Sequence, residues 1–264
     1  MDKIGFIGMG NMALALAKGF IKSQKIKAVN IFAYAPNQEK LKNNADRLGF
    51  IPCDSIKDLV KKCDTLVVAC KPYQIESVLA EIKDDLKDKN LLSVAAGWTY
   101  DTFAALVDSS TKILCIMPNT PAMVGEGVFL FEDKHSLSKT EYTQITDLFA
   151  SLGIVETLPT RLMGIGGAIS GCGPAFMDLI MEAYADAAVK YGISRAQAYR
   201  LIAQTMKGSA ALQIATGDHP GVLKDAVCSP GGTTICGVDA LEKAGLRAAC
   251  IGSIDAIMMK KSNK

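Results

Sequence analysis

The chain has 264 residues, of which 49% are hydrophobic and 21% charged, with 29 Lys and Arg against 27 Asp and Glu. This length predicts a large domain with a smaller partner, and the composition is that of a globular protein with a sizeable core rather than a disordered chain. The charge is nearly balanced and has no long block of one sign, which argues against nucleic acid as a partner.

The first part of the chain alternates short apolar runs with amphipathic stretches. Runs rich in β-branched residues predict strands at residues 4–7, 29–34, 65–69, 91–94 and 113–117. Between them, apolar residues that recur every three or four positions predict helices at residues 12–21, 38–48, 56–62, 74–86 and 100–107. Strands that are apolar on both faces are buried in a parallel sheet covered by helices on both sides. The sequence therefore predicts an α/β fold that begins with a Rossmann-like, doubly wound, mostly parallel sheet.

The pattern changes after about Thr160. Before this point, two further strands are predicted at residues 127–131 and 154–158, with a helix over about 138–151 between them. After it, the sequence predicts helices alone, at residues 174–191, 195–216, 221–227, 234–243 and 246–260. Ser194, with Gln197 three residues later, predicts a capping box at one of these helix starts. We expect a dinucleotide-binding domain at residues 1–160 and an all-helical C-terminal domain at 161–264. Because these helices carry more apolar residues than one stripe requires, we also expect a helical interface between subunits.

A glycine pattern lies between the first predicted strand and the first predicted helix. Gly8 permits a tight turn, Gly10 lets backbone amides approach a pyrophosphate, and Ala13 keeps the helix close to the sheet. The positive end of that helix would face the phosphates. The sequence thus predicts a dinucleotide site, to which we assign the residues of this turn: Ile7, Gly8, Met9, Gly10, Asn11 and Met12.

The end of the second predicted strand bears on the choice of coenzyme. NAD-binding proteins usually carry an acidic residue there, which binds the ribose and repels a 2′-phosphate. This chain has Ala35, Pro36 and Asn37 instead, with Lys40 nearby and no arginine to clamp a phosphate. We include Ala35, Pro36 and Asn37 in the cofactor site, and we expect NADPH to be favoured while NADH remains allowed.

Two further turns follow strands that would neighbour the first. Ala69, Cys70, Lys71 and Pro72 end the strand at 65–69, at the edge where ligands of open α/β sheets bind. Alternatively, Lys71 is a solvated charge and Pro72 only opens the next helix. After the following strand, Ala96 and Gly97 offer a small-residue surface on which a nicotinamide ring could lie flat, or form a crowded turn.

The segment 223–235 resembles the signature loop of the pyrroline-5-carboxylate reductases. It reads Leu-Lys-Asp-Ala-Val-Cys-Ser-Pro-Gly-Gly-Thr-Thr-Ile, and further similarity runs, in the family's order, through segments 5–13, 69–72, 95–97, 117–122 and 169–175. The resemblance implies that hydride from C4 of NAD(P)H reduces the cyclic imine 1-pyrroline-5-carboxylate to L-proline. It also implies a homodimer of swapped or interlocked C-terminal helices, which can build a larger ring such as a decamer.

The signature loop itself has the chemistry of a carboxylate site. Small donors and glycines stand directly before a predicted helix, so the amides of Gly232, Thr233 and Thr234, together with Ser229, could hold the acid of the substrate. As in the family, the Thr234 hydroxyl is then the candidate catalytic group that hydrogen-bonds the ring nitrogen. Without the resemblance, this composition would indicate an ordinary connection between helices.

The chain also departs from the family pattern. Ile56 stands where the family commonly has an asparagine that reaches the adenosine ribose, and glycines over 162–167 predict a weakened helix. Cys172 and Cys228 replace hydroxyl residues; they are either redox-active or simple small-residue packing. His219 is expected to serve a turn or a cap rather than acid-base chemistry. The segment 117–121 either shapes the nicotinamide pocket or forms a rigid bend.

Two other functions were weighed. A reductase of the β-hydroxyacid dehydrogenase type needs a catalytic lysine on a helix, but no candidate lies in a Lys-x-x-Asn setting (Lys190, Lys207, Lys224 and Lys243). A nucleotide sensor without catalysis would not need a complete substrate loop.

Cysteine usage and hydropathy bear on location. The eight cysteines show no CxxC pair and no histidine at ligand spacing, so no zinc site and no disulfide framework is expected. No apolar run approaches the roughly 20 residues of a membrane span, and the first one has only a strand's length. We expect a cytoplasmic protein with reduced thiols and no membrane partner.

Overall fold

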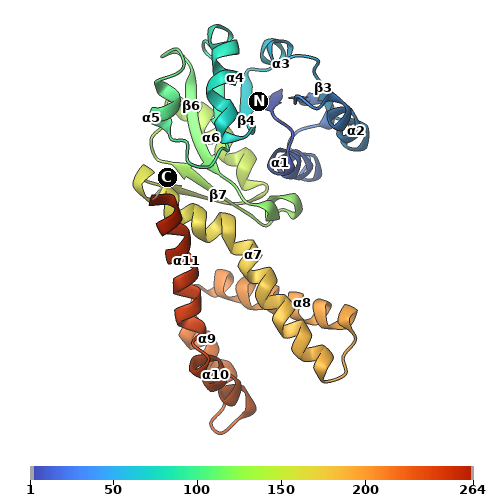
Figure 1. Cartoon of the computed structure of the whole chain (residues 1–264), viewed down its shortest axis with the longest axis vertical. Helices are drawn as coiled ribbons and strands as arrows, with labels where there is room; N and C mark the ends of the chain where they lie inside the picture. The colour runs from blue at the N-terminus through green and yellow to red at the C-terminus, as the bar shows by residue number, and fades with distance from the viewer. Residues whose placement is uncertain (1–2, 263–264) are drawn as a thin grey trace. The chain divides into compact units, whose positions relative to one another are not determined.

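The computed structural model describes residues 3–262 (Figure 1). Contacts divide the chain into two compact units, Met1–Pro174 and Ala175–Lys264, called here the first and the second unit. The division falls inside a long helix. The predicted domain boundary at residue 160 lies at the first residue of that helix and stays a prediction.

A single eight-stranded sheet forms the centre of the first unit, in the order β3-β2-β1-β4-β5-β6-β7-β8. All neighbours are parallel except β6 and β7, so the predicted doubly wound, mostly parallel sheet is confirmed. The strands are β1 (Ile4–Ile7), β2 (Ile31–Tyr34), β3 (Ile51–Pro52), β4 (Thr65–Val68), β5 (Asn90–Ser93), β6 (Lys112–Met117), β7 (Gly127–Glu132) and β8 (Gly153–Leu158). Only β3 was not predicted; it has two residues, and its proline is tolerated because β3 is an edge strand.

Helices of the first unit cover both faces of this sheet. They are α1 (Asn11–Lys22), α2 (Gln38–Leu48), α3 (Ile56–Lys62), α4 (Ile75–Ile82), α5 (Tyr100–Ala104) and α6 (Lys139–Ala150), with 3-10 turns η1 (Ala28–Asn30), η2 (Pro72–Gln74), η3 (Lys83–Asp85) and η4 (Thr120–Val124). Alternate side chains of β1 point to opposite faces: Ile4 and Phe6 join the core under α1 and α6, and Ile7 joins the core under α3 and α4. The central strand is thereby buried on both sides.

The remaining helices are α7 (Thr160–Lys190), α8 (Arg195–Thr216), α9 (Pro220–Val227), α10 (Thr233–Lys243) and α11 (Leu246–Ser262). The predicted start of α8 after Ser194 is right, but its predicted cap is wrong. The Ser194 hydroxyl donates to the Gln197 side chain at 2.7 Å and accepts no backbone amide.

Helix α7 begins fourteen residues earlier than predicted, at Thr160 rather than Pro174. The glycines expected to weaken this stretch instead let the helix approach the sheet: a Cβ on Gly166 would lie 2.6 Å from a Leu158 methyl and 2.7 Å from a Leu130 methyl. The low helix propensity of glycine is therefore offset by close packing.

Pro174 inside α7 has a specific compensation. A proline has no N–H, so the carbonyl four residues earlier, that of Ser170, loses its helical donor. The side-chain amide of Asn119 donates to this carbonyl at 3.0 Å, while its oxygen accepts the Val128 amide at 2.9 Å. Asn119 is itself buried. The segment 117–121 thus has a structural role, because it supports the first half of α7.

The second unit has little interior of its own. Of its described hydrophobic residues, only Ala185 and Ala198 are buried. Large side chains lie open instead, with Leu179 65%, Ile214 75% and Ile251 65% exposed. This distribution agrees with the expectation that the helices carry more apolar surface than one subunit can bury. The sequence was expected to hold no apolar run of the length of a membrane span, but α7, alone among the described helices, is long and apolar enough to cross a membrane by length and composition.

Candidate functional site

Four adjacent strands end at one edge of the sheet and carry the turns predicted to bind the cofactor. In space they run β2-β1-β4-β5, all parallel. Hydrogen bonds join their ends: the Gly8 amide donates to the Tyr34 carbonyl at 2.8 Å, and the Ala69 amide donates to the Ile7 carbonyl at 2.9 Å. The chain order reverses between β1 and β4, and crevices at such switch points bind ligands in open α/β sheets. The structure thus brings the predicted cofactor residues together.

Gly8 is required by both backbone shape and space. Its φ is +96°, a left-handed value that favours glycine, and an added Cβ would lie 2.8 Å from the Cys70 nitrogen. Gly8 therefore allows the ends of β1 and β4 to pack directly at the switch point.

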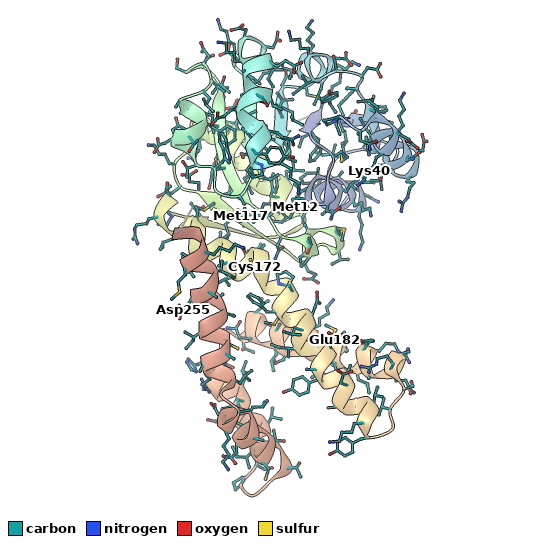
Figure 2. All side chains as sticks on the ribbon, viewed as in Figure 1. Met12, Lys40, Met117, Cys172, Glu182 and Asp255 are labelled. Atoms are coloured by element: carbon teal, nitrogen blue, oxygen red, sulfur yellow. The ribbon has the colours of Figure 1, made fainter. Side chains whose placement is uncertain are left out.

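The N-terminus of α1 is open for an anion. Gly10 is its N-cap in an extended conformation, and no side chain caps the first-turn amides. Nothing lies within 4 Å of a Cβ placed on Gly10, and no acidic residue occupies the first turn. Asn11 is exposed and Met12, labelled in Figure 2, is half-buried. Free amides at the positive end of a helix fit a pyrophosphate.

The loop after β2 is held in shape by α2. Asn37 caps this helix, its side-chain oxygen accepting the Lys40 amide at 2.9 Å, and Gln38 donates to the Ala35 carbonyl at 2.9 Å. Pro36, Asn37 and Lys40 are exposed. Figure 2 labels Lys40, which lies in the first turn of α2. Residues 35–38 after this strand include no carboxylate, and Glu39 follows in the first turn of α2.

The loops after β4 and β5 complete the edge. Ala69 and Cys70 are half-buried, and burial raises the pKa of the Cys70 thiol. Lys71 is exposed, its backbone amide donating to Gln74, and Pro72 opens η2. Ala96 and Gly97 are exposed, and Gly97 has a φ of +82° with nothing within 4 Å of an added Cβ. These two residues therefore present a small, open surface.

Glu132, at the end of β7, is a buried carboxylate that the sequence reasoning missed. It is 1% exposed; one oxygen accepts the Tyr100 amide at 2.7 Å and the other accepts the Thr160 hydroxyl at 2.6 Å. Across the antiparallel pair lies Cys115, whose pKa is raised by burial and, less strongly, by the charge and hydrogen bond of Glu132. The sequence feature that could have indicated this residue is its place as the one acid at the end of the otherwise apolar strand β7.

The predicted substrate residues lie in the second unit, between α9 and α10. Gly231 has a φ of +68°, and Gly232 packs against Ser229, where an added Cβ would lie 2.8 Å from the hydroxyl oxygen. The Gly232 amide donates to the Ser229 carbonyl at 2.9 Å. Gly232 is the N-cap of α10 and no side chain caps that helix, while Thr233 and Thr234 are exposed. The loop offers first-turn amides and hydroxyls to an anion.

His219 does what was expected of it. Its Nδ1 accepts the Gly221 amide at 3.0 Å, which caps α9. Cys172 and Cys228 are half-buried and free. The described residues hold no group of three or more His, Cys, Asp or Glu that could bind a metal ion.

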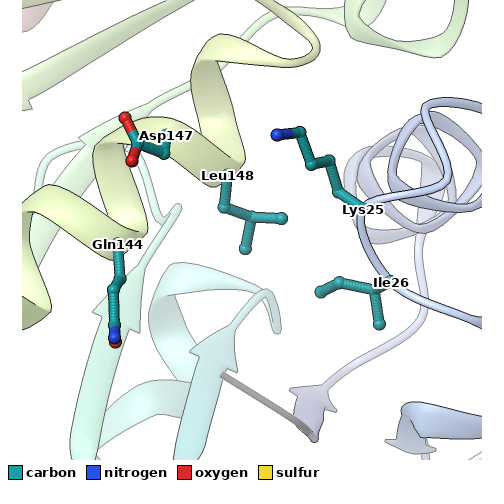
Figure 3. Close-up of a pocket in the computed structure, with 5 residues that line it drawn as sticks. All are labelled: Lys25, Ile26, Gln144, Asp147 and Leu148. Carbon is teal, nitrogen blue, oxygen red and sulfur yellow. The ribbon is translucent and has the colours of Figure 1, made fainter.

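A pocket of about 200 Å³ in the first unit contains none of the predicted site residues. Figure 3 shows its lining: Lys25, Ile26, Gln144, Asp147 and Leu148. Lys25 and Ile26 follow the C-terminal end of α1, whereas the cofactor turn precedes its N-terminal end. The pocket is therefore separate from the cofactor edge.

Comparisons with known proteins match the cofactor strands and the C-terminal helices separately. Residues 3–97 match the family model described as NADP oxidoreductase, coenzyme F420-dependent, and residues 160–264 match that of pyrroline-5-carboxylate reductase dimerisation. The chain is 41% identical over 259 residues to a pyrroline-5-carboxylate reductase of Treponema pallidum (strain Nichols), covering 97% of this chain and 98% of the relative. The chain belongs to the pyrroline-5-carboxylate reductase family.

Other members of the family support the assignment. The enzyme of Escherichia coli (strain K12) is 39% identical, covering 98% of this chain and 96% of its own length. A crystal structure of the pyrroline carboxylate reductase of Plasmodium falciparum, with NADP bound, superimposes with a TM-score of 0.89 at 36% identity, covering 98% of this chain and 96% of that one. The expected family, fold and class of enzyme, an NAD(P)-dependent oxidoreductase, are confirmed. The hydroxyacid dehydrogenase and sensor hypotheses are set aside.

Proposed function

We propose that this chain reduces 1-pyrroline-5-carboxylate to L-proline with NAD(P)H, the final step of proline biosynthesis. The observation that carries the proposal is the family membership over nearly the whole chain, joined to a complete substrate loop at Ser229–Thr234. The open amides before α10 suit the carboxylate that the substrate and its product share.

The cofactor residues are proposed as predicted. The uncapped first turn of α1 holds the pyrophosphate, while Ala35–Asn37, Ala69–Pro72 and Ala96–Gly97 line the same edge. When bound there, NAD(P)H supplies hydride from C4 of its nicotinamide. The fit rests on the free amides and on the open space at Gly10.

NADPH is the proposed coenzyme of preference, with NADH accepted less well. The end of β2 has no carboxylate to repel a 2′-phosphate. Since the oxygen of Asn37 is already used as the helix cap, its amide nitrogen remains as a donor. Lys40 adds a positive charge in the same turn, next to the carboxylate of Glu39. The NADP-bound relative from Plasmodium falciparum supports the same choice.

On the substrate side, amides of Gly232, Thr233 and Thr234 with the Ser229 hydroxyl bind the carboxylate. The Thr234 hydroxyl hydrogen-bonds the ring nitrogen and so orients the C=N bond. An imine accepts hydride readily only when it is protonated, so orientation, exclusion of water and one partner for the nitrogen supply much of the catalysis. No separate general acid is required by this scheme.

The second unit is the proposed site of self-association. The match to the family's dimerisation segment covers all of α7 to α11, and the exposed apolar side chains of these helices need a partner surface. We propose a homodimer of interlocked helices that can assemble into a larger ring, working in the cytoplasm.

The test is turnover of NADPH and of NADH with 1-pyrroline-5-carboxylate, each coenzyme titrated separately, with the product identified as proline. Substrate-dependent oxidation that forms proline is expected, with the larger specificity constant for NADPH. Folded protein that binds a coenzyme but forms no proline would contradict the proposed reaction, and a larger specificity constant for NADH would contradict the coenzyme preference alone.

A further inference from the structure

The loop that carries Ala96 and Gly97 is tied down at both ends. At its start, the Ala95 amide donates to the Ser93 hydroxyl at 3.3 Å. At its far end, the first amide of α5, that of Tyr100, donates to Glu132 at 2.7 Å. Between these ties lies Trp98, whose ring packs on Phe103 with centroids 5.0 Å apart. The conformation of the loop therefore depends on where the Glu132 carboxylate lies.

Glu132 joins two structures at once. Its second oxygen accepts the hydroxyl of Thr160, the first residue of α7, at 2.6 Å. Lys134, two residues later, forms an ion pair with Asp101 and lies over the Tyr100 ring, 5.4 Å from its centroid. A fully desolvated carboxylate is costly unless it is hydrogen-bonded, and the Tyr100 amide and the Thr160 hydroxyl satisfy that of Glu132. An apolar residue of similar size would avoid this desolvation cost, but it would leave the Tyr100 amide and the Thr160 hydroxyl without this acceptor.

We propose that Glu132 is a positioning residue for hydride transfer: by holding the Tyr100 amide and the Thr160 hydroxyl, it fixes the 95–99 loop and thereby the nicotinamide end of the cofactor. The inference rests on the proposed cofactor role of Ala96 and Gly97. Glu132 has no contact with the cofactor in this scheme and acts only through the loop. The phosphates are held elsewhere, at α1, so loss of Glu132 should affect turnover more than binding.

The experiment compares Glu132→Ala with Glu132→Gln in the full-length protein. The alanine variant leaves the Tyr100 amide without a buried acceptor, whereas glutamine keeps the shape and one acceptor oxygen. For Glu132→Ala we expect kcat to fall by about tenfold or more, the effect of ~1.4 kcal/mol, while the Kd for NADPH changes by less than about threefold. Glu132→Gln should recover most of kcat. Thr160→Val, which removes the other donor, should give a smaller fall in kcat and serves if the alanine variant does not fold.

A second measurement reports on the loop without turnover. Trp98 is the single tryptophan of the chain and lies inside the loop, so resonance energy transfer from it to bound NADPH reads the distance between them. We expect the transfer per bound NADPH to change in Glu132→Ala and to return towards the wild-type value in Glu132→Gln.

The matched control is Thr111→Val. The Thr111 hydroxyl is also buried and donates to a backbone carbonyl, that of Leu86, at 3.1 Å, but it precedes β6 and so lies at the opposite edge of the sheet. It should lower stability and leave kcat and energy transfer unchanged. If folded Glu132→Ala behaved like Thr111→Val, Glu132 would be merely structural and the inference wrong. If the wild type bound NADPH without any transfer from Trp98, the cofactor role of the loop would itself be wrong, and the inference would fall with it.

Discussion

The two units of this chain use apolar residues in opposite ways. The first unit buries them in two clusters, one on each face of its sheet, and its central strands are inaccessible to water. The second unit, equally rich in leucine, isoleucine and methionine, leaves Leu179, Ile214 and Ile251 largely exposed and buries only two alanines among its described hydrophobic residues.

This difference separates what one copy of the chain can stabilise from what it cannot. Burial of apolar surface is worth about 25 cal/mol per Å², and the large hydrophobic side chains described in the second unit are at most half-buried in one copy. A helical segment without an interior persists only when a partner surface covers it. The cofactor edge should thus be formed in a single copy, whereas the substrate loop depends on assembly.

The largest effect should follow from a charge in the exposed apolar surface of the second unit. In Ile251→Glu, self-association would bury an unpaired carboxylate, at a cost of several kcal/mol. We expect dissociation to smaller species in sedimentation velocity and loss of nearly all turnover.

The control places the same charge in the first unit. Val29 is 59% exposed, close to the 65% of Ile251, but the core of its unit is already complete. Val29→Glu should keep assembly and activity. Wild-type sedimentation by Ile251→Glu would show that this part of α11 is not an interface.

The next effect concerns the substrate loop alone. Thr234→Ala removes the hydroxyl proposed to hydrogen-bond the ring nitrogen, and a hydrogen bond to a charged group is worth about 1.5–3 kcal/mol. We therefore expect kcat/KM for the imine to fall by roughly 10- to 100-fold. The Kd for NADPH, measured by fluorescence, should stay at the wild-type value because the cofactor residues lie in the first unit. Unchanged turnover would remove Thr234 from the mechanism.

Alanine substitutions at the two glycines of the cofactor turn should have different effects, one on the stability of the first unit and the other on the binding of NADPH. Gly8→Ala places a Cβ 2.8 Å from the Cys70 nitrogen at a left-handed φ, so we expect the first unit to lose about 1–3 kcal/mol in denaturant unfolding followed through Trp98. Gly10→Ala meets no atom within 4 Å and should fold normally, yet bind NADPH more weakly because the methyl intrudes on the phosphate space. Equal stabilities of the two variants would contradict this distinction.

The smallest effect concerns the buried thiols of the first unit, which should make its stability depend on pH in the alkaline range. Burial raises the pKa of Cys53 to about 11 and that of Cys63 to about 12, whereas an unfolded cysteine titrates near 8.5. The folded first unit therefore keeps protons that the unfolded chain releases, so stability is full below about pH 8.5 and falls as the pH rises towards those values.

Unfolding of the first unit, read by Trp98 fluorescence in denaturant at several alkaline pH values, should show this fall. Cys63→Ala should make it shallower. In the second unit, Cys228 is half-buried and Cys236 and Cys250 are exposed. A fall that is equally steep in the variant would assign it to other groups.

The sequence predicted most of the fold because most elements carry local signals. Helix α2 was placed to the residue, with an asparagine cap and a left-handed Gly49 after its last turn. The errors fall where tertiary contacts decide. The first half of α7 looks too glycine-rich for a helix, until the packing of Gly166 on Leu158 and Leu130 is known.

The candidate site also has a part that the sequence predicted and a part that depends on tertiary contacts. Its cofactor turns could be predicted because each directly follows a strand, and parallel strands bring their ends to one edge. Glu132 could not be assigned, since its partners Tyr100 and Thr160 come from distant parts of the chain. The hydrogen-bond donors of a buried carboxylate can be identified only when the fold is known, because they are distant in the sequence.

The bond between Asn119 and the Ser170 carbonyl has an evolutionary consequence. The Asn119 side chain replaces the N–H that Pro174 lacks as donor to this carbonyl, so the residues at positions 119 and 174 depend on each other. With any other residue at 174, the backbone N–H of that residue can donate to the Ser170 carbonyl, and asparagine is no longer needed at 119 for this bond. If the asparagine is lost while the proline stays, the buried Ser170 carbonyl has no donor. Among relatives, substitutions at these two positions should therefore occur together, and loss of the proline should come first.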